Sequence, residues 1–110
     1  MVRMSVYYPS QPGTTFDHDY YAGAHRRLVE ERLGALGLRR VEIERGVAGY
    51  GGAPAPYVAV GHLLFDSMET LGSAWAAGGD DVVADVPRFT SVQPVVQISE
   101  IVPAVEGAVA

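Results

Sequence analysis

The sequence predicts an α+β domain in which four antiparallel strands form a sheet with two helices on one face. Three observations support this prediction. Four segments alternate apolar and polar residues or are continuously apolar, as strands are, and two longer segments have helical periodicity. The segments follow the order strand, helix, strand, strand, helix, strand. The chain has 110 residues, which is the size of one domain.

The first half of the chain contains a predicted strand, helix and second strand. Residues 2–8 alternate in polarity and end at the turn-rich stretch "PSQPGT". Asp17 is a plausible N-cap of a helix that extends to about Leu36, where Gly37 provides a C-terminal stop. Residues 40–45 alternate again, which predicts a half-exposed strand.

The second half begins with the most apolar strand, residues 57–65, after a loop rich in Gly, Pro and Ala. Asp66 or Ser67 caps a second helix, which "AAGGDD" is expected to end. Residues 80–89 are predicted to be a linker with at most a helical turn. The last strand is "SVQPVVQISEIV", in which Pro94 indicates an edge or a bulge.

This order is the ferredoxin-like βαββαβ arrangement. We assign residues 1–103 to a single domain and expect residues 104–110 to form a frayed tail.

The third predicted strand is apolar on both faces, whereas the face without helices normally alternates to polar residues. One face carries Val58, Val60 and Leu64, and the other carries Tyr57, Leu63 and Phe65. A second copy of the sheet would remove several hundred Å² of apolar surface from water, worth several kcal/mol at about 25 cal/mol per Å². We therefore expect a two-fold homodimer, and a monomer with an exposed apolar face is the alternative. Any enclosed space would not be wholly apolar, because alternate positions are polar: Ser5, Gln93, Gln97 and Ser99.

Composition excludes several classes of function. The net charge is −5, which argues against nucleic-acid binding, and zero cysteines exclude disulfides, thiolate catalysis and cysteine-ligated metals. No nucleotide-binding glycine motif or nucleophile elbow is present. No apolar run has the length of a membrane span, and no signal peptide is evident, so we expect a soluble, cytoplasmic protein.

His25 is the main candidate for chemistry. On a helical wheel of about 100° per residue it falls between Leu28 and Val29 in the apolar stripe, one turn after Tyr21. A buried neutral imidazole needs a donor and an acceptor partner. His25 could therefore be structural, bonded to a strand carbonyl or a tyrosine hydroxyl. It could instead be a general base beside Tyr21, which we name as the second catalytic candidate.

Four further residues are candidates for substrate binding. Arg32 shares the helix face of His25 and could bind a carboxylate, although a guanidinium that extends past the apolar edge explains it as well. His62 is a substrate contact or a satisfied core histidine. Tyr7 could orient a substrate, and Gln97 could contact one. The three histidines of the chain lie on different elements without a metal-binding motif, so we expect no metal and no cofactor.

The stretch "YYPSQPGTTFDHDYYAGAHRRL" is similar to the N-terminal signature of EthD-like proteins. That signature is a strand ending in Tyr-Pro, a loop, Phe-Asp, and then Tyr-x-x-x-His-x-x-Leu, here Tyr21, His25 and Leu28. "LLFDSMETLGSAW" and residues 85–89 also resemble the family, whose members often carry a proline where this chain has Arg27.

The resemblance covers about residues 2–102 and implies a dimeric α/β barrel with His25 as the motif histidine. Relatives on this barrel include cofactor-free monooxygenases, polyketide cyclases, muconolactone isomerases and haem-degrading enzymes, so the fold does not determine the chemistry. We expect a homodimer that binds a small, mostly apolar organic molecule between sheet and helices. It would be a cofactor-independent oxidoreductase, isomerase or cyclase using His25. A non-catalytic binding or accessory module with a structural His25 remains the alternative, and haem use also stays open.

Overall fold

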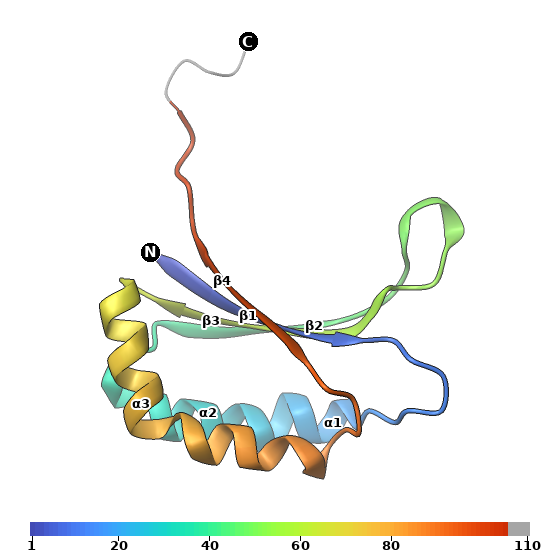
Figure 1. Cartoon of the computed structure of the whole chain (residues 1–110), viewed down its shortest axis with the longest axis horizontal. Helices are drawn as coiled ribbons and strands as arrows, with labels where there is room; N and C mark the ends of the chain where they lie inside the picture. Colours follow the sequence, from blue (N-terminus) through green and yellow to red (C-terminus); the bar gives the residue numbers. More distant parts are fainter. Residues whose placement is uncertain (106–110) are drawn as a thin grey trace.

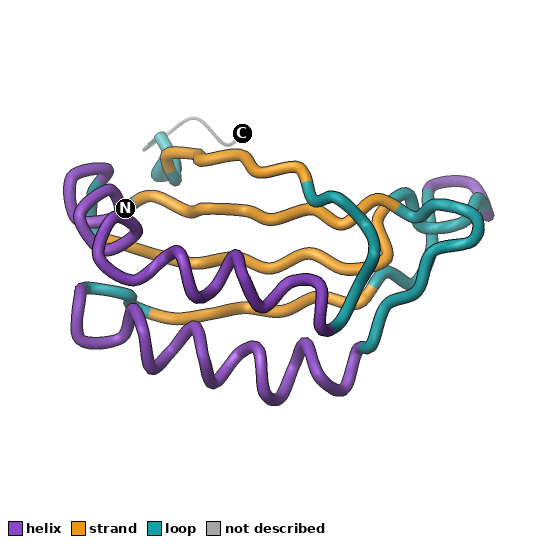
Figure 2. The backbone as a smooth tube through the Cα atoms, turned by 60° about the horizontal axis from the view of Figure 1, so that its bottom comes forward, coloured by secondary structure: helices purple, strands orange, loops and turns teal. Residues whose placement is uncertain are grey.

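The computed structural model describes residues 1–105 and shows a four-stranded antiparallel sheet with helices on one face (Figure 1). The strand order is β2-β3-β1-β4, and Figure 2 shows the strands side by side. The predicted βαββαβ fold is confirmed. The strands are β1 (Val2–Pro9), β2 (Arg40–Arg45), β3 (Tyr57–Phe65) and β4 (Val95–Glu100). The helices are α1 (His18–Tyr20), α2 (Arg26–Leu33) and α3 (Met68–Asp85).

Short helical segments connect these elements. A π-helical segment, Tyr21–His25, joins α1 to α2, and 3₁₀ turns occupy Gly34–Leu36, Tyr50–Gly52 and Val86–Arg88. No helix within residues 1–105 is both long and apolar enough to cross a membrane. Of the predicted frayed tail, residues 106–110 lie outside the described residues.

The first helix begins and ends where the sequence predicts. The Asp17 side chain accepts a hydrogen bond from the Tyr20 backbone N–H at 3.0 Å, which satisfies one free donor of the first turn. Gly37 has a φ of 109°, the left-handed conformation that ends many helices. A Cβ atom at Gly37 would also overlap the Thr70 side chain. Both the backbone conformation and the lack of space therefore favour glycine at this position.

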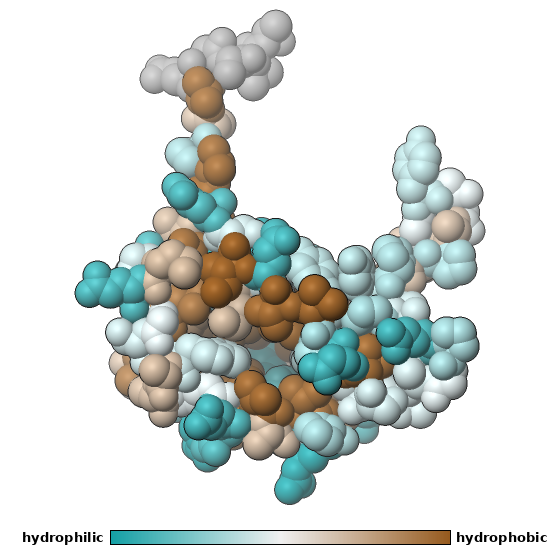
Figure 3. Space-filling model, in the orientation of Figure 1, coloured by the Kyte–Doolittle hydropathy of each residue, from teal (hydrophilic) through white to brown (hydrophobic). Residues whose placement is uncertain are grey.

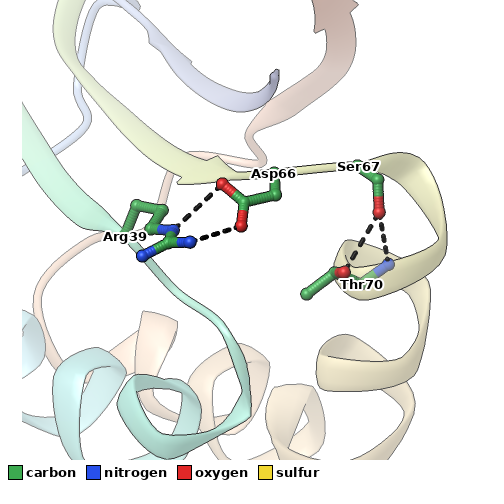
Figure 4. Close-up of polar contacts among 4 residues, drawn as sticks. All are labelled: Arg39, Asp66, Ser67 and Thr70. Carbon is green, nitrogen blue, oxygen red and sulfur yellow. Dashed lines mark hydrogen bonds and ion pairs between the residues drawn. The ribbon is translucent and has the colours of Figure 1, made fainter.

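Ser67 caps α3, which decides between the two predicted caps. Its Oγ accepts from the Thr70 backbone N–H at 3.1 Å, whereas Asp66 pairs with Arg39 through two bonds of 3.0 and 2.5 Å (Figure 4). The Arg39 guanidinium holds the pKa of Asp66 below its usual value. This pair joins the start of β2 to the end of β3.

The prediction that "AAGGDD" ends the second helix, with a linker over residues 80–89, is wrong. α3 continues to Asp85, because the two glycines of this stretch, Gly78 and Gly79, serve helix packing. A Cβ atom at Gly78 would lie 2.6 Å from the Arg32 carbonyl oxygen of α2, and one at Gly79 would lie 2.6 Å from the Trp75 ring. Close approach to α2 and to the indole outweighs the low helix propensity of glycine.

The strand register separates two faces of the sheet. Met4 pairs with Leu63 on the helix-covered face, and Ser5 pairs with both His62 and Gln97 on the other, which we call the open face. Two hydrophobic clusters lie between the sheet and the helices. The first cluster is mostly aliphatic and includes the fully buried Leu33 and Phe65. The aromatic cluster contains Tyr8, Tyr21, Ala59, Phe89 and Val92.

A β-bulge in β3 changes two of the predicted face assignments. Tyr8 pairs with Ala59 and Pro9 pairs with Tyr57, so Val58 is the extra residue. Tyr57 therefore lies on the open face, with its ring 5.0 Å from that of Tyr7, and Val58 packs against the aromatic cluster. The prediction that Tyr57 shares a face with Leu63 and Phe65, and that Val58 shares one with Val60 and Leu64, is wrong, because strict alternation takes no account of a bulge.

Candidate functional site

An apolar cavity of about 320 Å³ lies between the sheet and the helices, and His25 forms part of its wall. Figure 3 shows the hollow below the sheet, rimmed by hydrophobic side chains. The polar side chains at its wall include His25, Arg26 and Gln93. Both the sheet and the helices contribute apolar side chains to the wall. They include Met4, Val6 and Leu63 from the sheet and Val29, Trp75 and Val82 from the helices. Such a lining suits a small organic molecule with few polar groups.

The π-helical segment presents Tyr21 and His25 together. The Arg26 backbone N–H bonds to the Tyr21 carbonyl, which is five residues earlier and defines the wider turn. The rings of Tyr21 and His25 stack at a centroid distance of 5.6 Å with an interplanar angle of 22°, and both residues are buried. Single π turns inside helices occur frequently at functional sites.

Asp85, the last residue of α3, holds His25 by one ring nitrogen. Its Oδ2 lies 2.9 Å from His25 Nδ1, and the two side chains are only 10% and 7% exposed. A carboxylate can only accept, so Nδ1 carries the proton in this bond. Nε2 is then the basic nitrogen, and no hydrogen-bond partner for it is found among residues 1–105.

Two further side chains hold Asp85. The Tyr20 hydroxyl donates to Asp85 Oδ1 at 2.9 Å, and Arg88 Nε lies 3.6 Å from the same oxygen. The bond to Asp85 raises the pKa of Tyr20, so its hydroxyl remains a donor at neutral pH. These contacts offset the cost of burying a carboxylate and orient it toward the histidine.

The Tyr21 hydroxyl lies against the backbone of β3. A Cβ atom at Gly61 would overlap this oxygen, which explains a glycine in the middle of an otherwise apolar strand. Burial raises the pKa of Tyr21, and the neighbouring Tyr8 hydroxyl raises it further. Tyr21 is therefore a neutral donor at the cavity wall.

Solved structures with this architecture include an EthD-like protein from Ralstonia eutropha JMP134. It is 35% identical in sequence, with a TM-score of 0.85, over 96% of this chain and 95% of that chain. The chain belongs to the EthD-like family. The predicted family resemblance is thus confirmed.

Two more distant structures share the fold of this EthD-like protein. An EthD family protein from Bacillus halodurans C-125 is 20% identical, with a TM-score of 0.73, over 93% of this chain and 99% of that chain. A dimeric protein of unknown function from Bacteroides fragilis NCTC 9343, with a ferredoxin-like fold, is 10% identical, with a TM-score of 0.54, over 91% and 95%. No protein-family model matches the chain, and no curated protein matches it.

Only two of the predicted site residues of the EthD-like chain line the cavity, His25 and Tyr21. Arg32 is exposed and pairs with Asp81 at 2.7 Å, so it points away from the cavity toward the outside of α3. Tyr7, His62 and Gln97 lie on the open face.

The open-face candidates have polar partners of their own. His62 Nδ1 lies 2.8 Å from Ser5 Oγ, and its Nε2 lies 3.2 Å from Glu44 Oε1. Gln97 Nε2 donates to Ser99 Oγ at 3.0 Å. The sheet therefore separates these residues from the cavity beside His25.

Sequence reasoning missed Asp85 and Tyr8 in the EthD-like chain. Asp85 lies in the stretch expected to be a linker, although residues 85–89 also belong to the family resemblance, and that was the available signal. Tyr8 lies on the helix-covered face of β1, where the alternating pattern predicts a core residue and gives no sign of a functional one. Among residues 1–105, no three His, Asp or Glu side chains form a group that could hold a metal ion.

Proposed function

We propose that this EthD-like protein binds a small, mostly apolar organic molecule in the cavity, and that His25 exchanges a proton with it. The observation that supports this proposal is the buried His25–Asp85 pair at the wall of an apolar cavity of about 320 Å³. A histidine with one nitrogen bonded to a carboxylate and the other free is the arrangement of a general base.

The proposed chemistry needs no cofactor. His25 Nε2 takes a proton from substrate, and the imidazolium that forms is stabilised by Asp85 at 2.9 Å. Tyr21, stacked on His25, orients the bound molecule. Transfer of a proton from carbon is a step common to isomerisation, cyclisation and cofactor-independent oxygenation. We therefore propose an isomerase, cyclase or oxidoreductase of this kind.

A non-catalytic binding or accessory module is the second candidate. The same His25–Asp85 bond ties the π-helical segment to the end of α3, two parts of the chain that are 60 residues apart. A purely structural histidine would make this contact as well. The two candidates differ in what the free Nε2 does.

We also propose that the chain forms a homodimer through the open face. Its support is the partly exposed apolar and aromatic surface there, including Tyr7, Tyr57 and Val95. The similar fold of a protein described as dimeric adds to it. Residues 1–103 would be the single domain of each protomer, and the net charge of −5 supports neither nucleic acid nor an anionic membrane surface as a partner. A cytoplasmic location belongs to the same proposal.

Exchange of carbon-bound hydrogen in D₂O tests the catalytic proposal directly. A panel of apolar 1,3-dicarbonyl compounds is incubated with the full chain, and loss of the α-hydrogen signal is followed by NMR. We expect His25→Gln to slow the protein-dependent exchange about 10²- to 10⁴-fold and Asp85→Asn to slow it less. His62→Gln is the matched control and leaves the rate unchanged, because His62 lies across the sheet.

Unfolding in urea is measured on the same variants. If wild type and His25→Gln exchange at equal rates while His25→Gln loses about 1–3 kcal/mol of stability, the binding or accessory role replaces the catalytic one.

A further inference from the structure

Tyr8 and Tyr21 lie side by side at the wall of the cavity. Their ring centroids are 5.4 Å apart at an interplanar angle of 76°, and both residues line the cavity together with His25. The two side chains come from β1 and from the π-helical segment, so sheet and helix each contribute one phenol.

Within the described part of the chain, neither hydroxyl has a hydrogen-bond partner. Tyr8 is 2% exposed and Tyr21 is 4% exposed, yet no hydrogen bond from either hydroxyl is found among residues 1–105. Within the same residues, Arg3 Nε is the single side-chain polar atom that is sealed from solvent without a partner. The two hydroxyl oxygens therefore still reach accessible space, and at this depth that space is the cavity. Two buried phenols without partners are costly unless a ligand accepts their hydrogen bonds.

Both hydroxyls are held in the neutral, donating form. Burial raises the pKa of Tyr8 and of Tyr21 above the ordinary tyrosine value. The neighbouring Tyr8, whose ring centroid lies 5.4 Å from that of Tyr21, raises the pKa of Tyr21 further. Neutral O–H donors in an apolar site bind a negatively charged oxygen strongly, because little water competes for it.

We propose that Tyr8 and Tyr21 together bind the oxyanion that forms when His25 removes a proton, and that the substrate is an uncharged, enolisable ketone. This inference rests on the proposed general-base role of His25. His25 Nε2 takes the proton as the C–H bond next to the carbonyl breaks. The electron pair forms a C=C bond, and the carbonyl π electrons move to oxygen. The enolate oxygen accepts hydrogen bonds from both tyrosines, and the imidazolium returns the proton to carbon to complete the turnover.

The charges around the cavity favour a neutral substrate over a carboxylate. Arg26 is the arginine at the cavity wall, and two of its guanidinium nitrogens already have partners. Its Nη2 donates to the Val41 carbonyl at 3.1 Å, and its Nε lies 3.7 Å from Glu30 Oε1. Asp85 adds negative charge behind His25. A negative charge is therefore stabilised only on the substrate oxygen where it develops, beside the two hydroxyls.

The ionisation of bound 4-nitrophenol tests this pair, since its phenolate mimics an enolate and differs from the phenol in absorbance. The bound probe is titrated with the full chain as wild type, Tyr8→Phe and Tyr21→Phe. We expect wild type to lower the apparent pKa of the probe, and each variant to reduce its ionisation constant at least about threefold. Tyr57→Phe, on the open face, is the matched control and leaves the constant unchanged.

A non-ionising ligand separates lost binding from lost oxyanion contacts. 4-Nitroanisole should bind wild type and both cavity variants with equal affinity, which also shows that the variants are folded. If 4-nitrophenol binds but ionises equally in all proteins, or does not bind at all, the oxyanion pair is wrong. The deuterium exchange lost in His25→Gln decides the general-base role independently of this outcome.

Discussion

At the scale of single residues, the two ring nitrogens of His25 have different surroundings. Its Nδ1 is bonded to Asp85, which connects helices and also fixes the tautomer, and its Nε2 remains basic. His25 lines a cavity together with Tyr8 and Tyr21, whose hydroxyls have no hydrogen-bond partner within residues 1–105. Under the proposed function, Nδ1 has the structural role and Nε2 the chemical one.

The buried tyrosines predict that the fold becomes less stable at alkaline pH. Because burial raises the folded-state pKa of Tyr8 and Tyr21, their contribution is complete below the ordinary value of about 10. It is lost as pH rises above that value, since the unfolded chain then releases protons that the folded chain retains. Urea unfolding between about pH 9 and pH 11 should show a falling free energy of unfolding, with a smaller fall in Tyr21→Phe. Equal slopes in both proteins would contradict the burial of a neutral Tyr21.

At the scale of elements, the site depends on how β3 meets the π-helical segment. The Tyr21 ring reaches the sheet at Gly61, where only a hydrogen atom leaves room for its hydroxyl. The neighbouring rings of Tyr8, Phe16 and Phe89, with centroids 4.9 to 5.4 Å from that of Tyr21, limit its movement. The glycine and the π turn thus position the same side chain from two directions.

Gly61→Ala should therefore destabilise the protein by about 1–3 kcal/mol through overpacking, and should weaken 4-nitrophenol ionisation by displacing the Tyr21 hydroxyl. Gly72→Ala is the matched control. It lies in α3 with open space around it, and it should stabilise the fold by about 0.5–1 kcal/mol. Urea unfolding of both variants measures the difference. Equal effects of the two substitutions would show that Tyr21 moves freely.

At the scale of the whole molecule, the open face of the sheet is not covered by any helix of the described chain. The loop between β2 and β3 and the segment after β4 both project on this side (Figure 1). Val47 and Tyr50 in that loop are 91% and 101% exposed, and Val102 is 77% exposed. Projections rich in exposed apolar residues fit a second copy placed against the open face.

Val95→Asp tests this placement of a second copy. Val95 pairs with Tyr7 on the open face and is 58% exposed, so a charge there should not disturb the protomer but should prevent association. We expect a dimer for wild type and a monomer for Val95→Asp in sedimentation equilibrium. Met68→Asp is the control, since Met68 is 54% exposed in the first turn of α3, where an acidic side chain is favourable. A monomeric wild type at high concentration would rule out the dimer.

The sequence by itself determined the strand and helix order, the caps at Asp17 and Gly37, and the pairing of Tyr21 with His25 on one helix face. These features depend on side-chain period and on hydrogen bonds within a few residues, so local pattern contains them.

Only the tertiary structure decided the rest. Asp85 meets His25 across 60 residues because α3 continues past Gly78 and Gly79. The local pattern of two glycines predicts the end of a helix, and the packing of α2 against Gly78 explains why the helix continues. The bulge at Val58 and the contact of Gly61 with Tyr21 likewise arise between elements distant in the chain. The physical reason is that packing between such elements can outweigh local propensity, and no short stretch of sequence contains both partners.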